Sequence, residues 1–78
     1  MKTSEFLQHV DKYVLINNHI RRGQAAYNVA SQLFGEKNII PVAGSLDDPF
    51  YNDNVLPSFL HWLRKNSLLE LDTSSEPM

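Results

Sequence analysis

The sequence predicts an all-α fold, a compact three-helix domain with a long ordered loop between the second and third helices. Apolar residues recur at helical spacing in three segments, at about residues 4–17, 22–34 and 54–66. Residues that favour turns, chiefly Asn, Asp, Gly and Pro, separate these segments. The chain has 78 residues and no cysteine, so we expect one domain, residues 1–78, without a disulfide.

The first helix begins near Thr3 or Ser4, both of which are good N-cap residues, and Glu5 suits the positive end of the helix dipole. Asn17 and Asn18 favour a turn and predict its end. One face of this helix is apolar and consists of Phe6, Leu7, Val10, Tyr13 and Val14. The connection to the second helix is short, which predicts that the two helices pack against each other.

The second helix ends at Gly35, where glycine permits a left-handed C-terminal cap. Its predicted apolar arc consists of Ala26, Tyr27, Val29, Ala30, Leu33 and Phe34. The opposite side carries the amides of Gln24 and Asn28, whereas solvated helix faces usually carry Lys and Glu. Amides make directed hydrogen bonds, so this side is suited to fastening a neighbouring loop or a partner.

Residues 36–52 contain two prolines, one glycine and no helical period, which predicts the long loop. Phe50 and Tyr51 favour an ordered loop, because burying either ring would anchor it to the helices. The third helix begins at Asp53 or Asn54 and tolerates Pro57 in its first turn. Residues 72–78 have the composition of a frayed tail.

The charge distribution indicates no large basic or acidic field. The net charge is −2, and the seven basic residues are spread along the chain. Binding to nucleic acid by counterion release needs several clustered cations, so electrostatics do not favour it. The N-terminal residues lack the long apolar core of a signal peptide, and no apolar run approaches the ~20 residues of a membrane span. We therefore expect a cytoplasmic protein.

Catalytic and metal-binding motifs are not recognisable in the sequence. The three histidines lie on different predicted segments, without the spacing of a helical zinc site. The carboxylate-rich stretch around Asp47 and Asp48 lacks the ligand spacing of a calcium loop, and turn formation and helix capping explain it. There is no nucleophile elbow and no phosphate-binding glycine loop. We expect no enzyme activity, no metal and no cofactor.

Three motifs stand in order along about half of the chain, from Arg22 to Leu63: R-x-G-Q-A-x-Y-N, D-P-F-Y-x-D and F-L-x-W-L. In this order they resemble a group of small proteins encoded by phages and prophages. The resemblance implies an accessory phage protein that acts in the cytoplasm of the host cell by binding a host protein. An inhibitor of host defence, such as an anti-CRISPR protein, belongs to this class. A structural phage component is an alternative, and self-association as a homodimer is a further expectation.

Two roles are open for the residues of the first two motifs. They form a partner-binding site, or they clamp the loop to the second helix, in which case the partner binds elsewhere. In the clamp, Arg22 pairs with Asp48 or Asp53, the amides satisfy backbone groups of the loop, and Gly23 allows close approach. The residues concerned are Arg21, Arg22, Gln24, Asn28, Asp48, Tyr51 and Asp53.

A helix-turn-helix protein that binds nucleic acid is the alternative function. The first two predicted helices and their short connection have the order of that motif. The second helix would then present Arg21, Gln24 and Asn28 to the groove of DNA.

Overall fold

The protein is all-α, as the sequence predicts, over the part of the chain that the structure describes. A computed structural model describes residues 1–71; the predicted tail, residues 72–78, lies outside the described residues. Within residues 1–71 the only β-type pairing is an isolated parallel bridge between Lys2 and Glu70. The helices are α1 (Thr3–Ile16), α2 (Arg22–Phe34), α3 (Glu36–Ile39) and α4 (Leu56–Lys65), with 3-10 turns η1 (Ile40–Val42) and η2 (Asp53–Val55).

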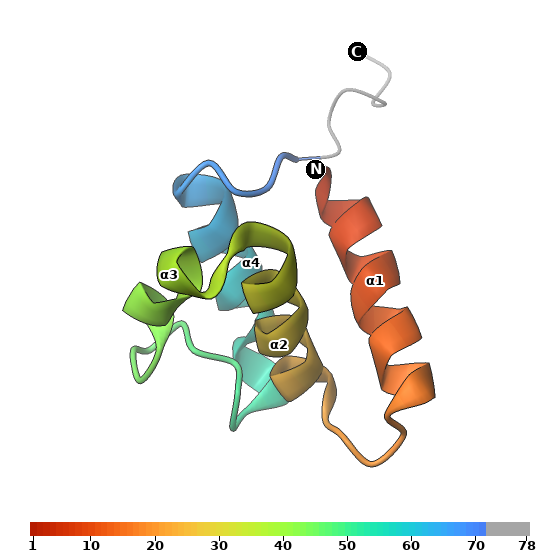
Figure 1. Cartoon of the computed structure of the whole chain (residues 1–78). Helices are drawn as coiled ribbons and strands as arrows, with labels where there is room; N and C mark the ends of the chain where they lie inside the picture. The colour runs from red at the N-terminus through yellow and green to blue at the C-terminus, as the bar shows by residue number, and fades with distance from the viewer. Residues whose placement is uncertain (72–78) are drawn as a thin grey trace.

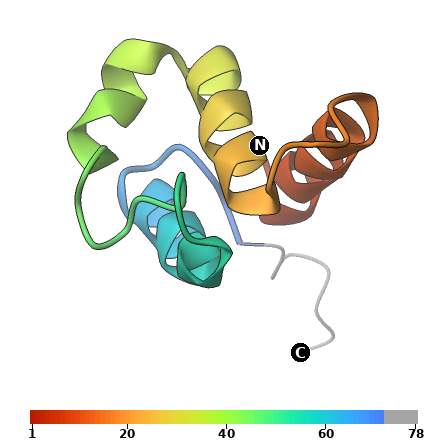
Figure 2. The same cartoon turned by 90° about the horizontal axis from the view of Figure 1, so that it is seen from below.

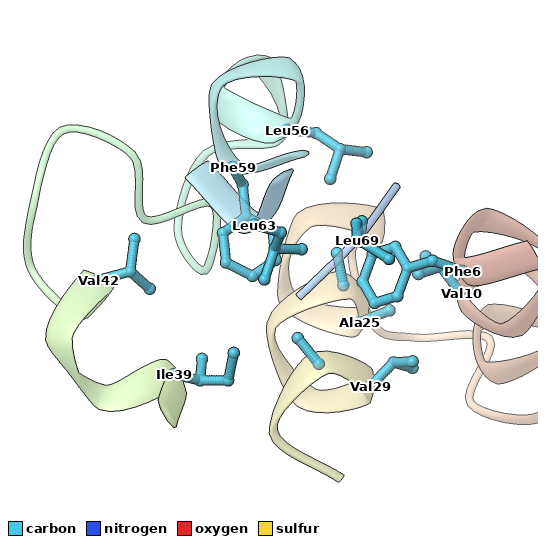
Figure 3. Packing of buried hydrophobic residues seen from close by; sticks show 12 residues of the cluster. Phe6, Val10, Ala25, Val29, Ile39, Val42, Leu56, Phe59, Leu63 and Leu69 are labelled. Carbon is cyan, nitrogen blue, oxygen red and sulfur yellow. The ribbon is translucent and has the colours of Figure 1, made fainter. Parts of the chain in front are cut away.

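Helix α2 occupies the centre of the fold. Helix α1 packs along one of its sides, and α3 and α4 cover the other (Figure 1). The view from below shows the same order, with α2 between α1 and the remaining helices (Figure 2). Figure 3 shows the side chains that fill the two contacts, where Phe6 and Val10 reach α2 from α1 while Ile39 and Val42 approach from the opposite side. The buried core consists of Phe6, Val10, Ala25, Ala26, Val29, Ala30, Ile39, Val42, Leu56, Phe59, Leu63 and Leu69.

The two-sided burial of α2 explains why its predicted apolar arc is too narrow. Ala25 lies outside that arc but is fully buried, while Leu33 lies inside it and is exposed. Small residues, namely Gly23, Ala25, Ala26 and Ala30, let neighbouring segments approach the backbone of α2 closely. A helix packed on two sides does not show the single apolar face that the periodicity argument assumes.

The predicted long loop is partly wrong, because its first seven residues form α3 and η1. Gly35 has φ +91° and turns the chain at the end of α2, although its ψ of 129° is not that of the predicted left-handed cap. Ile39 and Val42 then insert into the core. Helix α3 is a single turn, which is too short to show helical periodicity, and Pro41 is accommodated in the first turn of η1.

The start of α4 differs from the prediction by two residues. Neither Asp53 nor Asn54 caps α4, whose N-cap residue is Val55. Asn52 instead caps the 3-10 turn η2, and its Oδ1 accepts a hydrogen bond from the Asn54 N–H at 2.9 Å. The turn η2 follows, and α4 begins at Leu56. The carboxylate of Asp53 is therefore available for a contact with another helix.

The start of α1 also differs in its capping residue, which is Lys2 rather than Thr3 or Ser4. Glu5 Oε1 accepts a hydrogen bond from the Lys2 N–H at 2.9 Å. Asn17 is the C-cap residue, as the turn preference of asparagine predicts. Over residues 1–71, no helix combines the length and the apolar character needed to cross a membrane.

Candidate functional site

The loop that precedes α4 is fastened to the N-terminal end of α2 by Asp53. Its Oδ1 accepts a hydrogen bond from the backbone N–H of Gly23 at 3.0 Å. Gly23 is the second residue of α2, so its N–H is one of the donors that an isolated helix leaves without a partner. The carboxylate also lies at the positive end of the helix dipole. Asp53 thus caps α2 from a position 30 residues further along the chain.

Close backbone contact between the loop and α2 requires glycine at position 23. A Cβ atom on this residue would overlap the carbonyl oxygen of Pro49 and lie 2.9 Å from Asp53 Oδ1. Pro49 is itself fully buried, so its carbonyl has little room to move away. The motif glycine therefore allows the approach that the sequence predicts for it.

Hydrogen bonds within the loop, and one from Arg21 at the start of α2, fix the backbone conformation of the loop. Arg21 Nη1 donates to the carbonyl oxygen of Tyr51 at 3.1 Å. The two carboxylate oxygens of Asp48 each accept one backbone N–H, that of Gly44 at 2.7 Å and that of Phe50 at 2.9 Å. Such local contacts restrict the conformations of a segment that has no regular secondary structure of its own.

Three aromatic rings line a hollow between α2 and the loop. The rings of Tyr27 and Phe50 meet edge to face, with centroids 5.5 Å apart and planes at 89°. Phe50 also meets Tyr51 at 4.8 Å and 64°. The hollow has a volume of about 460 Å³, and we call it the aromatic hollow; its lining is Tyr27, Ala43, Gly44, Ser45, Asp48, Phe50 and Tyr51.

Burial and two nearby carboxylates act on the hydroxyl of Tyr27, which lines the aromatic hollow. Burial raises the pKa of the Tyr27 hydroxyl above its ordinary value of 10.0, and the carboxylates of Asp48 and Glu36 raise it further. The hydroxyl is therefore neutral at physiological pH.

Two large apolar side chains of the loop point into solvent. Leu46 is 95% exposed and Tyr51 is 80% exposed, although the backbone around them is fixed by the contacts above. We call the surface formed by residues 43–51 the loop surface. Binding residues lie disproportionately on loops that a rigid scaffold positions, and this loop presents both side chains in that way.

The structure brings together four of the seven residues singled out in the sequence, Arg21, Asp48, Tyr51 and Asp53, at the contact of the loop with α2. Arg22 lines a second hollow together with Asp53, but its guanidinium pairs with a residue of α1. Arg22 Nη2 lies 3.0 Å from Asp11 Oδ1 on α1, so the expected pairing of Arg22 with Asp48 or Asp53 is wrong. Arg22 lies on the side of α2 that faces α1, whereas Arg21 precedes the helix and reaches the loop.

The two amides also lack the expected contacts with the loop. Asn28 Nδ2 lies 3.5 Å from the hydroxyl oxygen of Tyr13 on α1, at the long limit of a hydrogen bond. Gln24 is half-buried, and its side chain has no hydrogen bond within residues 1–71. The expectation that these amides satisfy backbone groups of the loop is therefore wrong.

Sequence reasoning missed the contributions of Tyr27, Gly44 and Leu46 to this region. Tyr27 falls in the predicted apolar arc, so the sequence does not show that it also lines the aromatic hollow. Gly44 has φ +78°, and an isolated glycine ahead of Asp47-Asp48-Pro49 is a signal for such a turn. Nothing in the sequence distinguishes Leu46 from an apolar residue that anchors the loop.

Within residues 1–71, no three His, Cys, Asp or Glu side chains lie close enough together to hold a metal ion. Comparison of the chain with protein-family models, with curated proteins and with solved structures gives no match.

Proposed function

We propose that the protein is a non-enzymatic binding module that contacts a partner protein through the loop surface. One observation carries this proposal: Leu46 and Tyr51 are exposed on a segment whose backbone is held by Asp48, Arg21 and Asp53. Large side chains that gain little from the fold of their own domain are candidates for burial against another protein.

The fixed backbone matters for affinity as well as for position. Binding by a flexible segment loses free energy to ordering, about 0.5–1.5 kcal/mol for each immobilised side chain, in addition to the cost of ordering the backbone. The contacts of Asp48 and Arg21 restrict the backbone before a partner arrives. Tyrosine adds a large rigid ring, the type of side chain that is enriched at the centre of protein interfaces.

The nature of the partner rests on the three motifs in the sequence. Their resemblance to phage-encoded proteins supports a host protein as the partner, in the cytoplasm of the host cell, and inhibition of a host defence such as a CRISPR effector as the consequence. Binding to nucleic acid has less support, because Arg21, which a DNA-reading α2 would present, contacts Tyr51, and the neighbouring cation Arg22 pairs with Asp11. Phosphate contacts by these cations would have to compete with those interactions.

The test is an affinity capture from host lysate with the tagged protein and with three variants. Tyr51→Ala and Leu46→Ser each remove one exposed side chain of the loop surface. Leu15→Ser is the matched control, because Leu15 is also 80% exposed but lies on α1. Half of every sample is treated with nuclease before the captured proteins are identified by mass spectrometry.

The proposal expects a discrete host protein that survives nuclease treatment, that Leu15→Ser still captures and that both loop variants lose. Capture that is equal for all variants would refute the loop surface as the binding site. Recovery of nucleic acid alone, lost on nuclease treatment, would favour the helix-turn-helix alternative.

A further inference from the structure

The aromatic hollow contains a carboxylate that no cation neutralises within residues 1–71. Asp48 is half-buried, and each of its oxygens accepts one backbone N–H, from Gly44 and from Phe50. The ion pair in the described chain joins Arg22 to Asp11, on the other side of α2. A carboxylate has about four lone-pair sites, so about two of those on Asp48 remain for a further donor.

The rings beside Asp48 add to the negative potential of the hollow. The face of an aromatic ring is negative and attracts cations, most strongly in Trp and Tyr. Tyr27 and Phe50 stand nearly perpendicular, at 89°, and the exposed ring of Tyr51 meets Phe50 at 64°. The hollow thus combines three aromatic rings in different orientations with a carboxylate.

We propose that the aromatic hollow receives an arginine side chain of the partner protein, whose guanidinium stacks on a tyrosine ring and donates to the Asp48 carboxylate. This inference rests on the proposed function and specifies the chemistry of the partner. Arginine fits better than lysine because its planar group stacks on rings and carries several N–H donors in one plane. The volume of about 460 Å³ leaves room for the side chain and for part of its neighbours.

A purely structural role of Asp48 makes a different prediction. If the carboxylate serves only to fix the turn between Gly44 and Phe50, the hollow will bind a charged side chain and a neutral side chain of the same shape equally well. Citrulline supplies that comparison, since it replaces the guanidinium of arginine by an uncharged urea group.

The experiment is a titration of the ¹⁵N-labelled full chain, followed by NMR, with three capped peptides at millimolar concentration. The peptides are acetyl-Gly-Arg-Gly-amide, its citrulline counterpart and its lysine counterpart. We expect the arginine peptide to shift the backbone resonances of Gly44, Asp48, Phe50 and Tyr51, the lysine peptide to act more weakly, and the citrulline peptide to leave them nearly unchanged. Added salt should reduce the response.

Tyr51→Leu is the matching variant, because it keeps an apolar side chain but removes the ring face. Its side chain is exposed, so the variant should fold, which circular dichroism checks. We expect its affinity for the arginine peptide to fall by roughly fivefold, whereas Leu15→Ser should bind the peptide like the unaltered chain.

Equal shifts with arginine and citrulline, shifts confined to other residues, or no shift at all would overturn the proposal. These outcomes are separable from failure of the proposed function. Host-protein capture that depends on Leu46 and Tyr51, together with equal responses to the two peptides, would refute only the arginine site. Capture that does not depend on the loop surface would refute the proposed function itself.

Discussion

Asp53 and Gly23 are joined by a hydrogen bond of 3.0 Å from the backbone N–H of α2 to a carboxylate of the turn that precedes α4. This bond satisfies a backbone N–H in the first turn of α2, and it also holds the end of the loop against that helix. The orientation of the loop surface therefore depends on the capping of a helix. A change at either residue should affect both the stability of the fold and the position of Tyr51.

Asp53→Ala should lower the free energy of unfolding by about 1 kcal/mol, the usual cost of losing a helix cap. Asp53→Asn keeps an acceptor oxygen and should cost less. Asp47→Ala is the control, because it removes a carboxylate from the same loop without removing the cap on Gly23. Urea denaturation measures the three values. A loss with Asp47→Ala equal to that with Asp53→Ala would contradict the capping role.

Gly23→Ala should destabilise the fold by roughly 1–3 kcal/mol, the range for overpacking a well-packed site. Alanine favours a helix over glycine by about 1 kcal/mol, but the overlap with the buried Pro49 carbonyl outweighs this gain. Thermal unfolding of the variant shows whether its stability falls or rises. Gly44→Ala is the comparison without steric overlap, since its Cβ meets nothing within 4 Å and its cost arises from φ +78° alone. If the Gly23→Ala variant were more stable, the loop backbone at Pro49 would have to move away from α2 at little cost.

Ile39→Ala should cost about 2–5 kcal/mol, whereas Ile40→Ala should cost much less. Ile39 is fully buried in the core, and its neighbour Ile40 is 54% exposed. The pair thus compares the same substitution at adjacent positions, and denaturant unfolding of both variants measures the difference. Similar small losses would mean that α3 and η1 do not belong to the folded core.

Stability should decrease as the pH rises above about 10, because Tyr27 has a raised pKa in the folded state. The unfolded chain loses the Tyr27 proton first, so the contribution of the neutral hydroxyl is complete below the unfolded pKa and is lost as the pH passes the folded pKa. Thermal unfolding between pH 8 and pH 11, about one to two units on either side of the ordinary tyrosine value, measures the effect. Tyr27→Phe should flatten this dependence, and an unchanged slope in that variant would assign it to other groups.

The long helices were predictable because periodicity over 10 to 14 residues determines both the type and the approximate bounds of an element. Helix α2 has the bounds that the sequence predicts, and α1 begins and ends within one residue of them. Helix α3 was not predictable, since four residues contain a single turn. Its existence depends on the burial of Ile39 and Val42, a tertiary effect.

The sequence predicted which residues form the candidate site better than it predicted the contacts that those residues make. The motifs identified Arg21, Asp48, Tyr51 and Asp53, which the fold brings together. They did not reveal that Arg22 pairs with α1, because adjacent residues at the start of a helix point in different directions. Exposure of Leu46 follows from the path of the loop backbone, which no local pattern specifies.

The ends of the described chain are held side by side. Glu70 donates its N–H to the Met1 carbonyl at 2.9 Å and accepts the Thr3 N–H at 2.8 Å. Residue 70 therefore lies next to the start of the chain. Because of this, the helices could follow one another in a different order along the sequence and still pack in the same way. A circular permutant that links residue 70 to Met1 and opens the chain between α1 and α2, at residues 17–21, should keep the same core and display the same loop surface.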